Sequence, residues 1–193
     1  ILVSPFVAGL TIVTRNYVRE EHAFVLSDFI DALKHNWVAF LLNGAIIYAA
    51  YIILSVSITY YAAQIKSNSI FFVPLAICIG IAILFVFAQY YIPIMIVTFD
   101  LNLKQVYKNA FIFSIVGLWR NLLLTVIFAV IILGLYVLML LMPLTLFLSI
   151  VFAILILFSF CMFLINFTVY PLIDKMMIQP YKDKEKDNQI SED

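Results

Sequence analysis

Long apolar stretches without a charged side chain dominate the pattern along the chain. Residues 35–65, 67–99 and 121–173 contain no Asp, Glu, Lys or Arg. A helix needs about 20 apolar residues to cross the hydrocarbon core of a bilayer, so each stretch is long enough for at least one crossing. The third stretch is too long for a single crossing, and we expect it to break near Met142-Pro143, because proline interrupts helices. The pattern therefore predicts four transmembrane helices, near 37–63, 72–98, 121–141 and 146–170.

The chain opens within apolar sequence. Residues 1–14 are apolar but short for a crossing, so they form either the end of a truncated span or a half-helix that begins at Ser4-Pro5. Because the chain does not begin with Met, we expect an N-terminal segment to precede it.

Two segments outside the predicted spans have a helical amphipathic pattern. In 24–37 the polar residues recur at helical spacing, and in 100–111 the residues Lys104, Gln105 and Lys108 do the same. Apolar residues occupy the opposite face of each segment. We expect both to be helices that lie in the headgroup region of the membrane.

These elements define an all-α fold. We predict a polytopic transmembrane helical bundle of four full spans, a partial N-terminal span and two cytoplasmic amphipathic interfacial helices. Residues 1–175 form a single transmembrane domain, and residues 176–193 form a polar tail whose alternating charges cannot support a folded core.

The distribution of Lys and Arg predicts the orientation. Of the 11 basic residues, Lys66 alone falls between the first and second spans, and the others flank the opposite ends of the spans. Because cytoplasmic loops are enriched in Lys and Arg, we expect the two longer loops and the C-terminus to be cytoplasmic.

Composition supports a membrane protein and leaves the chemistry open. The chain is 66% hydrophobic and 11% charged, and its net charge of zero points to no nucleic-acid partner. Cys78 and Cys161 lie within apolar stretches and are interpreted as packed apolar side chains. No catalytic, phosphate-binding or metal-binding motif occurs, so we expect no enzyme activity, no catalytic or metal site and no cofactor.

Uncharged polar residues within the spans are the first candidates for function. Each needs a hydrogen-bond partner in lipid, so contacts between helices are one interpretation, and the lining of a polar solute path is the other. The strongest candidates are Asn43, Gln89, Tyr90 and Asn166. Gln89 and Tyr90 precede Pro93, where a helix kink could form either a packing joint or a small cavity.

The charged residues of the two amphipathic segments form a candidate face for docking a partner. Asp31 is placed to pair with Lys34 or His35 on the same helix face, which would make the charges an ordinary solvated surface. The full set is Asp28, Asp31, Lys34, His35, Lys104 and Lys108.

Short stretches along nearly the whole chain resemble the YesL family of bacterial integral membrane proteins. They are Ser4-Pro5 with Val18-Arg19-Glu20-Glu21, residues 28–37, Tyr91-Ile92-Pro93, Phe99-Asp100 with Lys108-Asn109-Ala110, and residues 170–175. The resemblance implies a five-helix protein of the bacterial cytoplasmic membrane whose first helix is missing here, and it supplies no catalytic residues.

The resemblance also implies a link to the uptake of complex carbohydrates. We therefore expect an accessory or regulatory component that acts beside a sugar transporter permease or a membrane sensor kinase. The alternative is a small oligomeric transporter or channel for a sugar-derived solute. In either case the partners include the lipid bilayer, and a homo-oligomer is possible.

Overall fold

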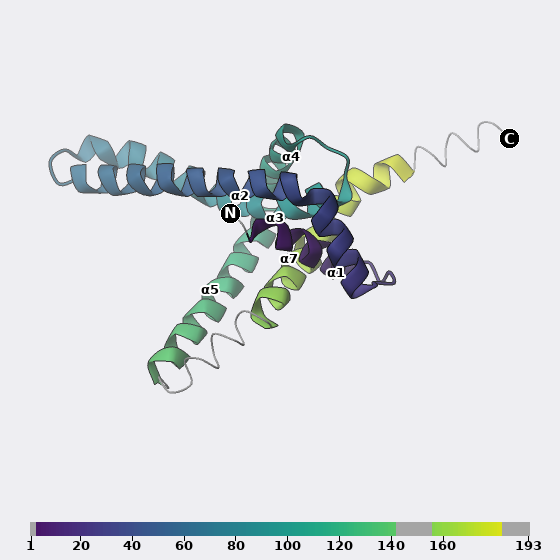
Figure 1. Ribbon diagram of the computed structural model, residues 1–193. Helices are drawn as coiled ribbons and strands as arrows, with labels where there is room; N and C mark the ends of the chain where they lie inside the picture. The colour runs from purple at the N-terminus through teal and green to yellow at the C-terminus, as the bar shows by residue number, and fades with distance from the viewer. Residues whose placement is uncertain (1–2, 142–155, 183–193) are drawn as a thin grey trace. The chain divides into compact units, whose positions relative to one another are not determined.

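The computed structural model describes residues 3–141 and 156–182, and every element within these ranges is helical, as the sequence predicted (Figure 1). Four of the helices are long and apolar enough to cross a membrane, and they span Val25–Gln64, Ser69–Thr98, Leu118–Val137 and Phe158–Lys182. These helices indicate a multi-pass membrane protein. The predicted break at Met142-Pro143 lies outside the described residues.

The chain forms two compact units. The first contains Ile1–Val13 and Ala23–Leu118, and the second contains Thr14–His22 and Trp119–Asp193. Helix α1, Ser4–Val18, begins in the first unit and ends in the second. It starts at Ser4, where the sequence placed the start of a half-helix.

Helix α2, Val25–Gln64, dominates the first unit. Its 40 residues correspond to about 60 Å, twice the thickness of the hydrocarbon core. The sequence predicted an amphipathic helix over 24–37 ahead of a span near 37–63, and in the structure both ranges lie within the continuous helix α2. Asn36 does not break the helix, since its Nδ2 donates to the backbone carbonyl of Ala32 at 3.1 Å.

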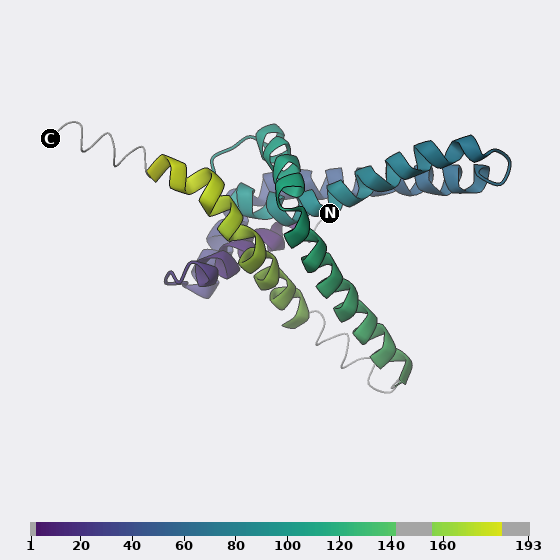
Figure 2. The ribbon, with the colours of Figure 1, turned by 180° about the vertical axis from the view of Figure 1, so that it is seen from behind.

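Helix α3, Phe72–Thr98, runs back along α2 after the short η1 turn, Ser69–Phe71, to form an antiparallel hairpin (Figures 1 and 2). Its second half is buried from Phe87 to Ile96, apart from the partly exposed Gln89. Pro93 is buried inside the helix. This half of α3 forms the core of the first unit.

Helix α4, Leu103–Val116, packs on the buried half of α3. It begins with a capping box, in which Asn102 accepts from the backbone of Gln105 and the Gln105 side chain bonds back. The rings of Tyr91 on α3 and Phe113 on α4 lie 5.5 Å apart. The predicted helix over 100–111 is therefore present as a separate element, and it extends further, to Val116.

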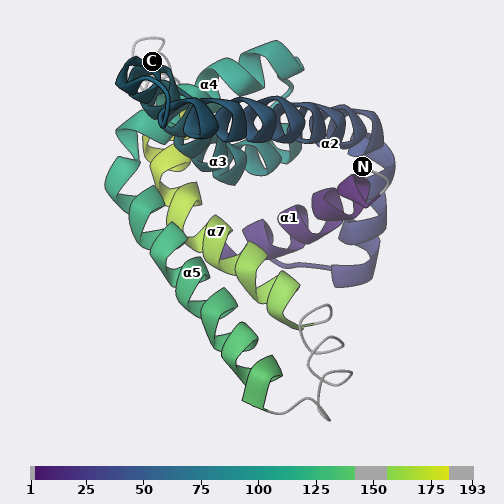
Figure 3. The ribbon, with the colours of Figure 1, turned by 90° about the vertical axis from the view of Figure 1, so that its left-hand side faces the viewer.

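The second unit holds helices α5, Leu118–Leu141, and α7, Phe158–Ile173, of which α5 starts one residue before the boundary (Figure 3). A π-helical turn, Asp174–Ile178, extends α7, and the helix continues to Lys182. The sequence predicts that the polar tail starts at 176, whereas the helix continues through this position, and Gln179 Nε2 donates to Asp174 Oδ2 at 2.9 Å within it. Residues 183–193 lie outside the described residues.

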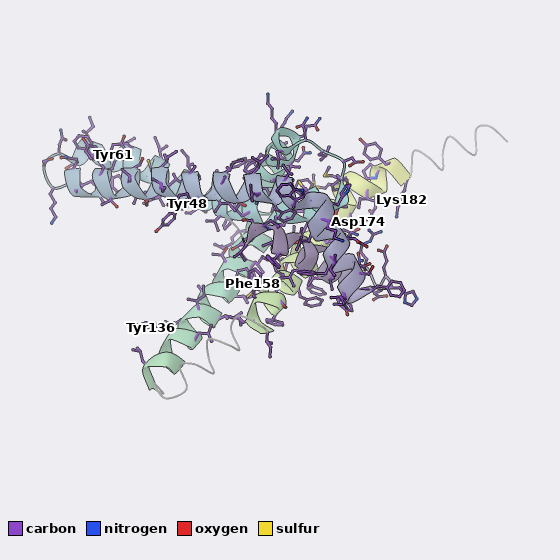
Figure 4. The ribbon with its side chains drawn as sticks, in the orientation of Figure 1. Tyr48, Tyr61, Tyr136, Phe158, Asp174 and Lys182 are labelled. Carbon is purple, nitrogen blue, oxygen red and sulfur yellow. The ribbon has the colours of Figure 1, made fainter. Side chains whose placement is uncertain are left out.

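Large apolar side chains cover the outer surfaces of both units. Ile53 and Val56 on α2 are more than 60% exposed, and Val130 on α5 is 63% exposed. Figure 4 shows the side chains of Tyr48 and Tyr136 projecting outward from α2 and α5. Exposed apolar surface of this extent is unfavourable in water and suits helices surrounded by lipid.

Candidate functional site

A polar cluster of Asn43, Gln89 and Tyr107 lies where helices α2, α3 and α4 of the first unit meet. Tyr107 Oη donates a hydrogen bond to Asn43 Oδ1 at 2.5 Å, and Asn43 is buried. Burial raises the pKa of Tyr107, and the adjacent Gln89 amide partly offsets this effect. The cluster therefore joins α2 to α4 through a neutral phenol.

Gln89 contributes a side-chain amide whose N–H groups lack an acceptor among the described residues. Its Nε2 is buried and makes no hydrogen bond of acceptable geometry with any described residue. Buried donors are normally satisfied, so this amide is the polar group of the cluster that is most able to receive a further acceptor.

Gln89 and Tyr90 also line a groove of about 530 Å³ between α2 and α3. Tyr51 and Ser55 add hydroxyl groups, and the other lining side chains are apolar. Asn43 does not line this groove. Its lining therefore fits a lipid chain or an apolar helix better than a sugar, which needs many hydrogen-bond partners.

Asn166 belongs to the second unit and serves as a contact between α7 and the end of α1. Its Nδ2 donates to Thr14 Oγ1 at 2.8 Å and to the backbone carbonyl of Met162 at 3.0 Å. Its Oδ1 is buried and accepts no hydrogen bond from the residues described. The four polar candidates are thus divided between two units, and Asn43 and Asn166 each hold a pair of helices.

The candidate docking face on α2 is exposed apart from the partly buried Asp28. Asp28 Oδ2 accepts from the backbone N–H of Phe24, the residue before the helix, at 3.1 Å. Asp31 accepts from Ser27 Oγ at 3.3 Å, so the predicted pairing of Asp31 with Lys34 or His35 is not formed.

Lys104 and Lys108 lie one turn apart on α4 and are both exposed. Neither makes an ion pair with a described residue. Both charges are therefore available to a partner.

The end of α1 contributes contacts that the sequence pattern did not suggest. Arg19 forms an ion pair of 2.6 Å with Glu21, and its guanidinium lies 5.7 Å from the centre of the Tyr170 ring. Tyr170 had been noted only as part of a family-like stretch. The sequence does place Tyr170 near the end of a predicted span and Arg19 in a basic segment. Aromatic rings attract guanidinium groups, so this pair of features could have suggested the contact.

Residues that commonly bind metals do not gather in the described ranges. No group of three or more His, Cys, Asp or Glu side chains lies close enough there to hold an ion. Cys78 and Cys161 are free thiols. The arrangement of polar groups among the described residues therefore offers helix contacts and charged surfaces.

The N-terminal part of the chain is similar to a known family. Residues 1–58 match the family model described as "Protein of unknown function, DUF624". The YesL family is of the DUF624 type, so this match and the resemblance point to the same group of proteins. The match covers α1 and most of α2. No curated protein and no solved structure matches the chain.

Proposed function

We propose that the chain is an accessory or regulatory component of a bacterial membrane system for carbohydrate uptake. The observation that carries this proposal is that its polar residues form two groups, one in contacts between helices and one on the exposed surface. Asn43 and Asn166 are engaged in contacts between helices. The basic residues of the candidate docking face, by contrast, are exposed and form no ion pair with a described residue; they are Lys34, His35, Lys104 and Lys108. The link to carbohydrate uptake rests on the resemblance to the YesL family, which is of the same DUF624 type as the family model that matches residues 1–58.

The partner in this proposal is a sugar transporter permease or a membrane sensor kinase. Its contact with the chain includes the docking face on α2 and the two lysines of α4. Lys104 and Lys108 are exposed and unpaired among the described residues, so a partner with an acidic surface would gain charge pairs there without first breaking any.

Affinity purification of the full-length protein from its native membrane, followed by mass spectrometry, tests the proposal. We expect stoichiometric recovery of a permease or kinase, and loss of that partner with Lys104→Glu/Lys108→Glu. Lys66→Glu is the matched control, because it reverses an exposed charge in the turn after α2. Recovery of the chain alone, or equal loss with Lys66→Glu, would contradict the proposal.

A small oligomeric transporter or channel is the second candidate function. The buried Nε2 donor of Gln89, which has no acceptor among the described residues, favours it. Flux of a sugar-derived solute into proteoliposomes, reduced at least tenfold by Gln89→Leu, would support transport. Equal flux with and without the protein would exclude it for that solute.

We also propose the cytoplasmic membrane of a bacterium as the location, with a cytoplasmic C-terminus. The support is the charge distribution, since Lys66 is the one basic residue among the 11 that falls in the turn between α2 and α3.

A further inference from the structure

A groove in the second unit combines one cation with an apolar wall. Its volume is about 430 Å³, and it is open to the outside. Three segments contribute to it, namely the end of α1, the start of α5 and the last turns of α7. The lining residues are Val18, Arg120, Leu123, Phe167, Thr168 and Pro171.

Arg120 is the charged residue of this groove, and its guanidinium is not engaged by any residue that the structure describes. It is exposed and makes no hydrogen bond or ion pair with the described residues. Among the described acidic residues of this unit, Glu21 pairs with Arg19, and Asp174 accepts a hydrogen bond from Gln179. A guanidinium presents parallel N–H groups that match a phosphate.

Thr168 adds a hydroxyl to the lining, and the remaining four side chains are apolar. A free phosphate ion would gain little from such walls, because they offer it no hydrogen bonds. A phosphate that carries hydrocarbon chains would use both the polar and the apolar parts of the groove. The combination therefore favours a phospholipid over a soluble anion.

The position of Arg120 along α5 places the groove at the height of a lipid headgroup. Arg120 lies in the first turn of α5, next to Trp119, which is 78% exposed. Trp is enriched at the boundary between headgroups and hydrocarbon. Beyond this turn, Leu123, Val126 and Val130 form an exposed apolar strip along α5 that an acyl chain can follow.

We propose that this groove binds one anionic phospholipid. The phosphate contacts Arg120 and the Thr168 hydroxyl, and one acyl chain lies along Leu123 and the apolar face of α5. Anionic lipids are the matching class because basic pockets between transmembrane helices attract their headgroups. The inference does not depend on the accessory function.

Native mass spectrometry of the full-length protein in detergent tests this proposal, with phosphatidylglycerol and phosphatidylcholine of identical chains as probes. We expect one phosphatidylglycerol to bind in preference to phosphatidylcholine. Arg120→Gln should weaken phosphatidylglycerol binding about fivefold, because it removes one basic contact near the headgroup. Lys182→Gln is the control, since it removes an exposed charge of the same unit outside the groove.

Three outcomes would overturn the site. They are equal affinity for the two lipids, unchanged phosphatidylglycerol binding by Arg120→Gln, and an equal loss with Lys182→Gln, which would indicate diffuse charge attraction. Glycerol 3-phosphate, which lacks acyl chains, should fail to displace the lipid, and displacement would identify a free-phosphate site instead. Thr168→Val provides a second variant of nearly unchanged shape, expected to weaken phosphatidylglycerol binding about threefold through its lost hydrogen bond.

Discussion

At the scale of single residues, amide side chains hold helices together in both units. Asn43 meets the Tyr107 hydroxyl on α4, and Asn166 meets the Thr14 hydroxyl on α1. Such bonds between helices in a membrane protein contribute about 0.6 kcal/mol on average and up to about 1.7 kcal/mol. Because Asn43 is buried, we expect the Asn43–Tyr107 bond to contribute an energy toward the upper end of this range.

A double-mutant cycle measures the Asn43–Tyr107 bond. We expect Asn43→Ala and Tyr107→Phe each to lower the free energy of unfolding, with a coupling of about 1 kcal/mol between them. Unfolding in mixed detergent and sodium dodecyl sulfate micelles provides the measurement. Tyr48→Phe, at an exposed position of α2, should change stability by less than about 0.5 kcal/mol. Additive effects of the two mutations would show that the bond is not formed.

The protonation of Tyr107 gives the same contact a pH dependence. Because burial raises its pKa above the ordinary value of 10.0, the folded protein holds this proton more tightly than the unfolded chain. Its stabilisation is complete below about pH 10 and decreases as the pH rises toward the folded pKa.

We therefore expect the stability advantage of the wild type over Tyr107→Phe to be constant from about pH 7 to pH 9 and to shrink above about pH 10. Unfolding curves of the two proteins at each pH provide the measurement. Subtracting the free energy of unfolding of Tyr107→Phe from that of the wild type removes the contribution of titrating groups that both proteins share. An advantage that grows above pH 10 would contradict the predicted direction of the pKa shift.

Sequence alone identified the polar residues but not their partners. Asn43 and Asn166 stand out because an amide is unfavourable in lipid unless it is bonded. Tyr107 is not among the candidates that the sequence singles out, and it lies 64 residues from Asn43 along the chain. A bond over that separation depends on how α4 packs on the hairpin, which periodicity within one helix does not determine.

At the scale of elements, hydropathy located the helices and local hydrogen bonds decided their ends. Four apolar spans were expected, and four such helices are present. The predicted amphipathic helix over 24–37 and the span that follows it are joined in one helix, α2, and Asn36 bonds to the Ala32 carbonyl within it. The capping box of Asn102 and Gln105, by contrast, gives α4 a separate start.

The packing of α1 on α2 depends on Gly9, and a matched pair of substitutions tests it. A methyl group at Gly9 would meet the Phe29 ring, 2.6 Å from Cγ, whereas one at Gly80 on α3 would meet no atom within 4 Å. We expect Gly9→Ala to destabilise the protein by about 1–3 kcal/mol through steric overlap. Gly80→Ala should stabilise it by up to about 1 kcal/mol, because alanine favours helix.

Unfolding in mixed micelles again measures both glycine variants. Gly9→Ala combined with Phe29→Leu should recover part of the lost stability, since the smaller side chain makes room for the methyl group. Equal stabilisation by Gly9→Ala and Gly80→Ala would show that α1 and Phe29 do not pack closely.

At the scale of the whole molecule, the chain places its charged side chains at the ends of apolar helices and leaves large apolar side chains exposed between them. This arrangement predicts which ends face the cytoplasm, because Lys66 is isolated from the other basic residues. Ser67 beside it and Lys182 at the end of the last described helix are both exposed, and they lie at opposite predicted ends of the spans.

Cysteine labelling of intact cells tests this orientation. In a protein with Cys78→Ser and Cys161→Ser, we expect Ser67→Cys to react with a membrane-impermeant maleimide without permeabilisation. Lys182→Cys should react only after the membrane is opened, because its thiol would face the cytoplasm. The parent protein without cysteine is the control for background labelling. The reverse pattern would place the basic ends of the helices outside, and the Arg120 groove would then meet lipids of the outer leaflet.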